Sequence, residues 1–477
     1  MSIKGKSLKL NAFLNMVRTF MGLLFPLITF PYVSRILGPV NIGKINFSQS
    51  IINYFVMFAM LGVSNYGIRE ASKVRDDKKR LSKFVKEILI LNLISSLIAY
   101  IALFFVVTFV KSLSNYKNLI FIFSTSILFT VIGVDWLFYA LEDLVSVTFR
   151  SCIFQVLSLA CLFLFVRKSD DYMNYAVICV ISSVGSNIFS LFVSVRFVDY
   201  RTKVKLELKK HLKPIMIFFF MTIAMTVNSS IDITMLGFIS GDKQVGLYSV
   251  ATRIVRIVTA VATATTVILP RLSYCYAQHK IVEMKEVIAN TLYTNICFVL
   301  PAIVGLFIIS KPIILILSGN EYIDSISILR VLSPTVLFIA LSNLTGSHLF
   351  MAIGKEKYVI YSIFSGILLN IALNFFFIPI FGGFGAGIAT CLTEFSVCFI
   401  QLLLARKFFS VLSLKPFCQF LIATLLMGSL VFYLQKIKIS YSYSASISII
   451  CGAFIYFLIL LVMKNETVCK ILKWRKK

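Results

Sequence analysis

Residues 87–110 read EILILNLISSLIAYIALFFVVTFV, and this stretch decides the fold class. After Glu87 it carries no charged side chain, and it is long enough to cross a hydrocarbon core of ~30 Å, which takes ~20 apolar residues in a helix. The same criterion, applied outward along the chain, finds about fourteen such stretches. The sequence therefore predicts an all-α polytopic membrane protein.

The predicted spans alternate with short connections, so that no segment between them can house a soluble domain. They cover residues 11–36, 44–67, 87–110, 119–141, 150–166, 174–195 and 214–240 in the first half, and 245–269, 291–310, 326–352, 359–380, 384–404, 416–434 and 445–463 in the second. Residues 311–319 are expected to form an apolar loop.

The composition of the 477 residues agrees with this assignment. Hydrophobic residues make up 59% of the chain and charged residues only 14%, which excludes a water-soluble enzyme, a secreted disulfide scaffold and a disordered chain. The 47 basic residues exceed the 20 acidic residues, but they lie between the apolar blocks and form no single patch. This distribution favours anionic headgroups over nucleic acid as the partner.

The basic residues also predict the orientation of the chain. They are about threefold more frequent on the side of the N-terminus than on the opposite side, which places both termini in the cytoplasm. The N-terminal apolar run is too long for a signal peptide and contains Arg18, so it is expected to be a retained helix.

No cofactor or metal is expected. The ten cysteines form no CxxC pair, and the three histidines are far apart, with His211 and His279 in predicted cytoplasmic loops and His348 late in a span. Gly354-Lys355 lacks the earlier glycine of a nucleotide-binding loop, which argues against an ATP-driven machine.

The first and seventh spans resemble each other. Each is followed by a short turn containing glycine, and the next helix opens with similar residues, Ile42-Gly43…Phe47-Ser48 against Val245-Gly246…Tyr248-Ser249. Six helices per repeat would relate two lobes by a pseudo-two-fold axis along the membrane normal, with a cavity between them. Chance similarity of apolar helices is the alternative. The predicted parts are an N-terminal lobe (1–213), a C-terminal lobe (214–405) and two accessory spans with a basic tail (406–477).

The opening of the chain carries a more specific resemblance. Its first span ends with Pro31-Tyr32-Val33-Ser34-Arg35-Ile36-Leu37-Gly38-Pro39, and its second ends with Tyr66-Gly67-Ile68-Arg69-Glu70-Ala71 before a basic loop. With Gly382-Gly383-Phe384-Gly385-Ala386-Gly387 later on, the chain resembles the polysaccharide-transporter (Wzx-type O-antigen flippase) branch of the multidrug/oligosaccharidyl-lipid/polysaccharide exporter superfamily.

This resemblance implies two six-helix lobes plus two C-terminal helices, and alternating access between them. It also implies a transporter, not an enzyme, in the bacterial inner membrane. The implied cargo is an oligosaccharide linked to undecaprenyl pyrophosphate. The polymerase and the chain-length regulator of the same pathway are possible partners, besides membrane lipids.

Charged side chains inside predicted spans are the candidate site residues, because an ion in the bilayer needs a cavity or a partner. Arg253 and Arg256 lie one turn apart on one helix face and are candidates for binding a pyrophosphate. Asp232 lies about ten residues before the turn at Asp242-Lys243, and Arg253 lies about ten residues after it. In an antiparallel helix pair both would lie ~15 Å below the turn, at similar depth in the membrane. A structural Asp232–Arg253 pair and an Arg256 side chain that reaches to the interface are the alternatives.

The remaining candidates are weaker. Arg18 and Arg35 are further pyrophosphate candidates, although interfacial positions explain both equally well. Asp232, Glu394 and Asp135 are candidates for coupling transport to H⁺ or Na⁺, and Asp135 lies beside Trp136 where interfacial anchoring is the alternative. Polar side chains that could face a cavity or join helices are Asn228, Ser229, Ser230, Thr234, Gln49, Asn53 and Asn65.

Three other functions stay open at this stage. A multidrug exporter for cations would need an acidic cavity, whereas arginines outnumber acids in the seventh and eighth spans. A membrane-embedded O-antigen polymerase or glycosyltransferase would need a large outward loop, and the longest here, near 311–325, has only Glu321 and Asp324. A relative of the lipid II flippases would use the same transport chemistry but carry a different sugar on its lipid.

Overall fold

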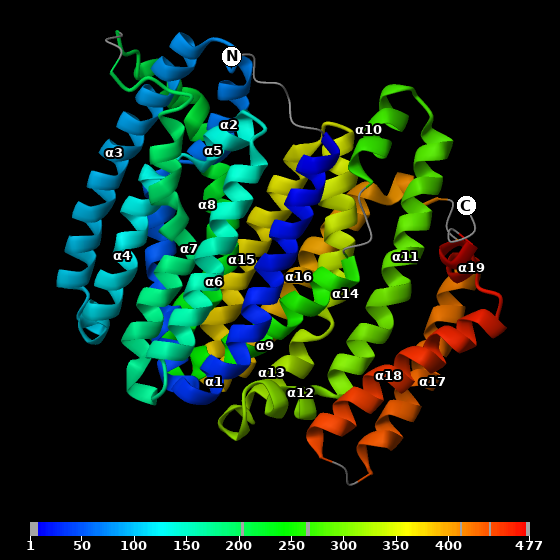
Figure 1. Ribbon diagram of the computed structural model, residues 1–477. Coiled ribbons are helices and arrows are strands. Elements are labelled where there is room, and N and C mark those ends of the chain that lie inside the picture. The colour runs from blue at the N-terminus through cyan, green and yellow to red at the C-terminus, as the bar shows by residue number, and fades with distance from the viewer. Residues whose placement is uncertain (1–7, 202–204, 264–267, 411–412, 438–439, 474–477) are drawn as a thin grey trace. The chain divides into compact units, whose positions relative to one another are not determined.

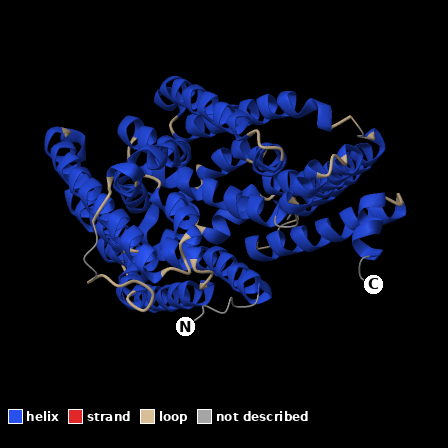
Figure 2. Ribbon diagram, turned by 90° about the horizontal axis from the view of Figure 1, so that it is seen from above, coloured by secondary structure: helices blue, strands red, loops and turns tan. Residues whose placement is uncertain are grey.

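The computed structural model consists of helices joined by turns and short loops, and the residues that it describes contain no strand (Figure 2). They are residues 8–201, 205–263, 268–410, 413–437 and 440–473, without the side chains of 8–21, 23, 24, 26 and 471–473. Thirteen helical segments among them are long and apolar enough to cross a membrane. One of these, Leu27–Lys73, includes Gly38, where two helices of α1 (Leu8–Met60) meet, and counting these two helices separately gives the fourteen that the sequence predicts. The predicted all-α fold class is confirmed.

Contacts divide the chain into two compact units, Met1–Phe238 and Ile239–Lys477. The first unit contains α1 and seven further α-helices (Figure 1). They are α2 (Val63–Lys73), α3 (Lys78–Phe109), α4 (Lys117–Ile132), α5 (Asp135–Ala140), α6 (Leu144–Phe165), α7 (Tyr172–Ser194) and most of α8 (Lys209–Ser240). Helix α1 packs against α3, α4 and α6, and α7 packs against α4 and α6.

The second unit is built from α-helices of 8 to 28 residues in the part of the chain that the structure describes (Figure 1). They are α9 (Asp242–Thr263), α10 (Leu269–Ala277), α11 (Ile281–Ile308), α12 (Ser310–Leu317), α13 (Ser325–Leu332), α14 (Thr335–Ser342), α15 (Glu356–Phe381), α16 (Gly383–Ala405), α17 (Leu414–Gln435), α18 (Tyr441–Val462) and α19 (Glu466–Lys473). Helices α15 and α16 form one antiparallel pair, and α17 and α18 form another. The predicted lobes, 1–213 and 214–405, are defined by a sequence repeat, whereas the two units are defined by contacts. The predicted lobe boundaries therefore stay a prediction.

Large apolar side chains lie on the outside of both units, as a hydrocarbon solvent allows. Phe104 and Phe109 of α3 are 67% and 76% exposed, and Phe375 and Phe376 of α15 are 66% and 65% exposed. The interior instead contains many small and polar side chains, such as Ser34, Ser158 and Ser190, each 0% exposed. Small residues allow helices to approach closely in a membrane, where burial of apolar surface supplies no driving force between helices.

Several predicted spans are interrupted where the sequence suggested one helix. The predicted span 119–141 is broken at Gly133 between α4 and α5. The predicted span 326–352 consists of α13, α14 and a π-helix at Asn343–Phe350. The expectation of an apolar loop at 311–319 is wrong, because α12 covers most of it. An apolar segment too short to span satisfies its backbone hydrogen bonds most easily as a helix.

Two glycines allow breaks in the first unit. Gly38 joins the two helices of α1 with φ 70°, and Pro39 follows it. Gly62 has φ 74° at the N-cap of α2, and a Cβ there would lie 2.6 Å from the carbonyl carbon of Phe218 in α8. A left-handed conformation and a close backbone approach both favour glycine.

We expect Gly62→Ala to destabilise the protein by more than about 2 kcal/mol, because it combines a strained φ with a backbone clash. The apparent melting temperature in detergent, measured by fluorescence-detected size-exclusion chromatography, checks this. Gly305→Ala is the matched control, since a Cβ at Gly305 meets nothing within 4 Å. An equal loss in both variants would contradict the explanation.

Candidate functional site

A band of hydroxyl groups joins α8 to α1 in the first unit. The Thr234 hydroxyl lies 2.9 Å from the carbonyl oxygen of Ser230, 3.0 Å from the Ser50 hydroxyl and 3.1 Å from the Tyr54 hydroxyl. The Thr234 hydroxyl thus joins α8 to α1, whereas the contact with Ser230 lies within α8, and a place for either residue in a cavity stays a prediction.

Asp232 and the other predicted polar positions lie around this band. Asp232 is half-buried and close enough to Tyr54 for an electrostatic interaction with its hydroxyl. Gln49 is half-buried, and the exposed positions are Asn53, Asn65, Asn228 and Ser229. The structure does not test whether these groups bind a cargo.

Asp135 has a partner that the sequence analysis missed. Its carboxylate forms an ion pair of 3.1 Å with the Arg150 guanidinium, whose side chain is only 11% exposed. The guanidinium also lies 4.5 Å from the ring centroid of Phe138, a distance typical of cation–π contacts. Two of its nitrogens, Nε and Nη1, are buried without a hydrogen-bond partner among the described residues. Asp135 and Arg150 thus form a charge-compensated pair where α5 meets α6.

The sequence does not single out Arg150 as an intramembrane charge, because it is the first residue of the predicted span 150–166. Basic residues are common at the ends of membrane spans. The helix begins earlier, at Leu144, which places Arg150 almost two turns inside it. The sequence feature that indicates this pair is the short separation of Asp135 and Arg150 along the chain, across the loop between α5 and α6.

The predicted pyrophosphate candidates are distributed over both units. Arg253 is half-buried and Arg256 is exposed, and both project from α9 one turn apart. Arg35 is exposed in α1, and the side chain of Arg18 lies outside the described residues. Asp232 belongs to the first unit and Arg253 to the second, so their pairing stays a prediction.

Glu394 lies halfway along α16 and is half-buried. Further along the same helix, the Gln401 amide donates to the Ser362 hydroxyl of α15 at 2.9 Å, and its carbonyl oxygen accepts from Thr345 at 2.8 Å. Thr345 belongs to the π-helix, a geometry that often occurs at functional positions. Glu394 thus lies on a helix with a buried polar network, although no contact tests its predicted role in ion coupling.

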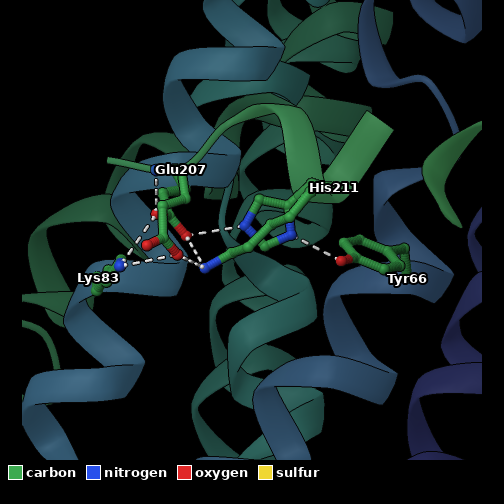
Figure 3. Close-up of polar contacts among 6 residues, drawn as sticks. Tyr66, Lys83, Glu207 and His211 are labelled. Carbon is green, nitrogen blue, oxygen red and sulfur yellow. Dashed lines mark hydrogen bonds and ion pairs between the residues drawn. The ribbon is translucent and has the colours of Figure 1, made fainter. Parts of the chain in front are cut away.

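The most connected polar network lies where α3 and α8 begin (Figure 3). The Glu87 carboxylate, 1% exposed, lies 2.8 Å from Nε2 of His211 and 3.2 Å from the Lys210 ammonium. The other ring nitrogen of His211, Nδ1, lies 2.7 Å from the Tyr66 hydroxyl of α2. Buried charges need this degree of pairing, because an unpaired carboxylate costs several kcal/mol.

The network also fixes the segment that precedes α8. The Glu207 backbone N–H donates to Glu87 at 2.7 Å, and the Glu207 carboxylate pairs with Lys210 at 3.0 Å and with Lys83 at 3.1 Å (Figure 3). These bonds from Lys210 and Lys83 lower the pKa of Glu207 below its ordinary value. The expectation that His211 lies in a loop is wrong, because it is buried in the first turn of α8.

Glu70 has two local partners. Its carboxylate forms ion pairs with Arg69 at 2.8 Å and with Lys73 at 2.9 Å. These residues have local partners and are poor candidates for binding a cargo.

Comparison with known proteins gives a consistent set of similarities. The family model described as Polysaccharide biosynthesis protein matches residues 8–275, and the MatE model matches residues 218–376. The "Putative O-antigen transporter" of Escherichia coli strain K12 is 25% identical over 391 residues, which cover 80% of this chain and 93% of that protein. The capsular polysaccharide biosynthesis protein CapF of Staphylococcus aureus is 24% identical over 378 residues, covering 76% and 90%.

A solved structure has the same fold. The lipid II flippase MurJ, in an inward closed conformation, superposes with a TM-score of 0.77 and covers 96% of this chain and 99% of its own. At 17% sequence identity this similarity concerns the fold alone.

We expect the Asp135–Arg150 pair to show strong coupling in a double-mutant cycle. Asp135→Asn and Arg150→Gln should each destabilise the protein by about 2 kcal/mol, because each leaves a poorly solvated charge unpaired. The double variant should lose less than the sum of the two. Melting temperatures of the four proteins in detergent check this, and additive losses would show that the pair is not coupled.

We expect a pH-dependent contribution from Glu207. Because its pKa is lowered in the folded protein, its ion pairs stabilise the protein at neutral pH, and this contribution is lost as the pH falls through the lowered value. The melting temperature of Glu207→Gln should therefore lie below that of the wild type at pH 7 and converge with it in acid. A difference that stays constant down to the unfolding pH would contradict this interpretation.

Proposed function

Since the chain belongs to the polysaccharide biosynthesis protein family, whose model matches residues 8–275, we propose that it moves undecaprenyl-pyrophosphate-linked oligosaccharide from the cytoplasmic to the periplasmic leaflet of a bacterial inner membrane. It is a multi-pass transporter of the multidrug/oligosaccharidyl-lipid/polysaccharide exporter superfamily and not an enzyme. The coarser activity, a flippase for lipid-linked oligosaccharides, is supported by the names of its relatives, which include a putative O-antigen transporter and a probable glycan biosynthesis flippase. The family match is the observation that carries the proposal.

The arginines of α9 suit the chemistry of the cargo. A pyrophosphate keeps its negative charge throughout transport, and guanidinium groups bind phosphate oxygens through paired N–H donors without losing their own charge. In the proposed mechanism Arg253 and Arg256 bind the pyrophosphate, with Arg18 and Arg35 as further ligands along its path. Polar side chains such as Asn53 and Asn228 contact the sugar, while the polyprenyl tail remains in the lipid.

Transport then follows an alternating-access cycle between two lobes. Asp232 and Glu394 are the proposed coupling groups, because both are half-buried carboxylates within spans. Asp135 is the least suited of the three predicted acids, since Arg150 already compensates its charge. Both termini face the cytoplasm in this scheme, and the polymerase and chain-length regulator of the pathway act on the exported product.

The MatE match to residues 218–376 keeps export of small cations as a second candidate function. A site for cations requires acidic groups in excess. The described part of α9 instead presents two arginines, with Asp242 as the acid of its first turn. Unchanged drug susceptibility in a deletion strain would remove this candidate.

Deletion of the gene tests the proposed function directly. We expect lipid-linked oligosaccharide to accumulate, detected by mass spectrometry of extracted lipids, and surface polysaccharide to disappear. Plasmid-borne wild type should restore both. A deletion strain with normal surface polysaccharide and no accumulated lipid would overturn the proposal.

The same strain tests the arginines. Arg253→Ala with Arg256→Ala should lower export by about tenfold or more, because two charge-assisted phosphate contacts are lost. Lys78→Ala with Lys79→Ala removes the same charge from exposed positions in α3 and is the control. Normal export by the arginine variant at equal expression would exclude these residues as ligands.

A further inference from the structure

The second unit contains a cavity that the transport mechanism does not use. Its volume is about 450 Å³, and it lies where α11 and α17 begin and where α18 passes into α19 (Figure 1). Three lysines line it, Lys415, Lys464 and Lys470, together with two carboxylates, Glu286 and Glu466. A cavity of this size is typical of sites for small ligands.

The lysines are available to a ligand. Lys415 and Lys464 are exposed and, among the residues that the structure describes, form no ion pair. The exposed Lys470 ammonium donates one hydrogen bond, of 3.3 Å, to the Asn290 side chain, which leaves two of its three donors. Lysines from the start of α17, from the turn after α18 and from α19 therefore line one cavity.

Hydrogen bonds hold the wall of the cavity in place. Asn465 caps α19 by accepting from the Thr467 backbone N–H at 3.0 Å, and its amide donates to Gln419 of α17 at 2.6 Å. Gln419 in turn donates to the carbonyl oxygen of Met463 at 2.9 Å. Lys464 has a left-handed φ of 49° at the C-terminal end of α18, where the Asn465 backbone N–H donates to the carbonyl oxygen of Leu460 at 2.9 Å. These hydrogen bonds define the turn between α18 and α19 that carries Lys464.

On the opposite wall, the Ser413 backbone N–H donates to the Tyr293 hydroxyl at 2.6 Å. This bond joins the start of α17 to α11, directly before Lys415. The cavity is therefore bordered by fixed backbone on two sides.

The position of the cavity suggests a lipid. Helix α11 has 28 residues, more than the hydrocarbon core requires, and the charged side chains of Glu283, Lys285 and Glu286 in its first two turns favour the headgroup layer for that end. Leu414 and Val462, at the ends of the adjoining spans, are 79% and 75% exposed and are suited to acyl chains. Basic pockets between helices at this level are suited to phosphate headgroups.

We propose that this cavity binds the phosphate of a lipid headgroup through Lys415, Lys464 and Lys470. The carboxylates Glu286 and Glu466 accept hydrogen bonds from hydroxyl groups beside the phosphate, such as those of a glycerol headgroup. The site is separate from the arginines of α9, and a bilayer phospholipid or the cargo lipid could supply the phosphate.

Native mass spectrometry of the purified full-length protein tests the site, with phosphatidylglycerol and undecaprenyl diphosphate as separate probes. Diacylglycerol with the same acyl chains serves as the phosphate-free comparison. Lys415→Gln, Lys464→Gln and Lys470→Gln together should lower the affinity for at least one probe by about tenfold or more, given the contribution of each lysine near a lipid phosphate. The probe that loses affinity identifies the source of the phosphate.

The control variant carries Lys78→Gln, Lys79→Gln and Lys357→Gln, which remove the same charge from exposed positions elsewhere. It should bind both probes as the wild type does. Equal binding by the pocket variant and the wild type, an equal loss in the control, or equal binding of diacylglycerol would each overturn the proposal. The phosphatidylglycerol measurement does not depend on the cargo, so its failure is distinguishable from failure of the proposed flippase activity.

Discussion

The hydrocarbon solvent imposes the constraint on which the rest of this structure depends. Within the bilayer no water can satisfy a backbone N–H or a charged side chain, so each must find a partner inside the protein. The described chain meets the first requirement with helices, including α12 in a segment too short to span. It meets the second with contacts such as the Asp135–Arg150 ion pair and the hydrogen bond between Glu87 and His211.

The same requirement for internal hydrogen-bond partners applies where the helices are interrupted. The break at Gly38 in α1, the break at Gly133 after α4, and the π-helix at Asn343–Phe350 all release backbone groups from the regular pattern. In a lipid-facing position such interruptions are costly, and they are tolerated where neighbouring helices or a wet cavity receive the freed groups. The π-helix lies beside the polar side chains of Gln401 and Ser362, which fits this expectation.

The number and the approximate limits of the spans could be predicted from the sequence, because the length of an apolar run depends only on bilayer thickness. The family resemblance was likewise visible in the first 70 residues. The buried polar contacts were not predictable, since they join segments that packing brings together: Glu87 and His211, which share a hydrogen bond, lie 124 positions apart. Arg150 was missed for a smaller reason, namely that α6 begins at Leu144 and not at residue 150.

These pairings separate the charges that the fold uses from those that remain for a ligand. Asp135 and Arg150 compensate each other's charge, and the Glu87 carboxylate is paired with His211 and Lys210, so these charges already have partners in the folded protein. Arg256 on α9 is instead exposed, as are Lys415 and Lys464 beside the cavity at α19. A cation retained near the bilayer without a carboxylate partner lowers its energy when a phosphate binds to it. The exposed cations of the second unit are therefore where anionic lipids should act.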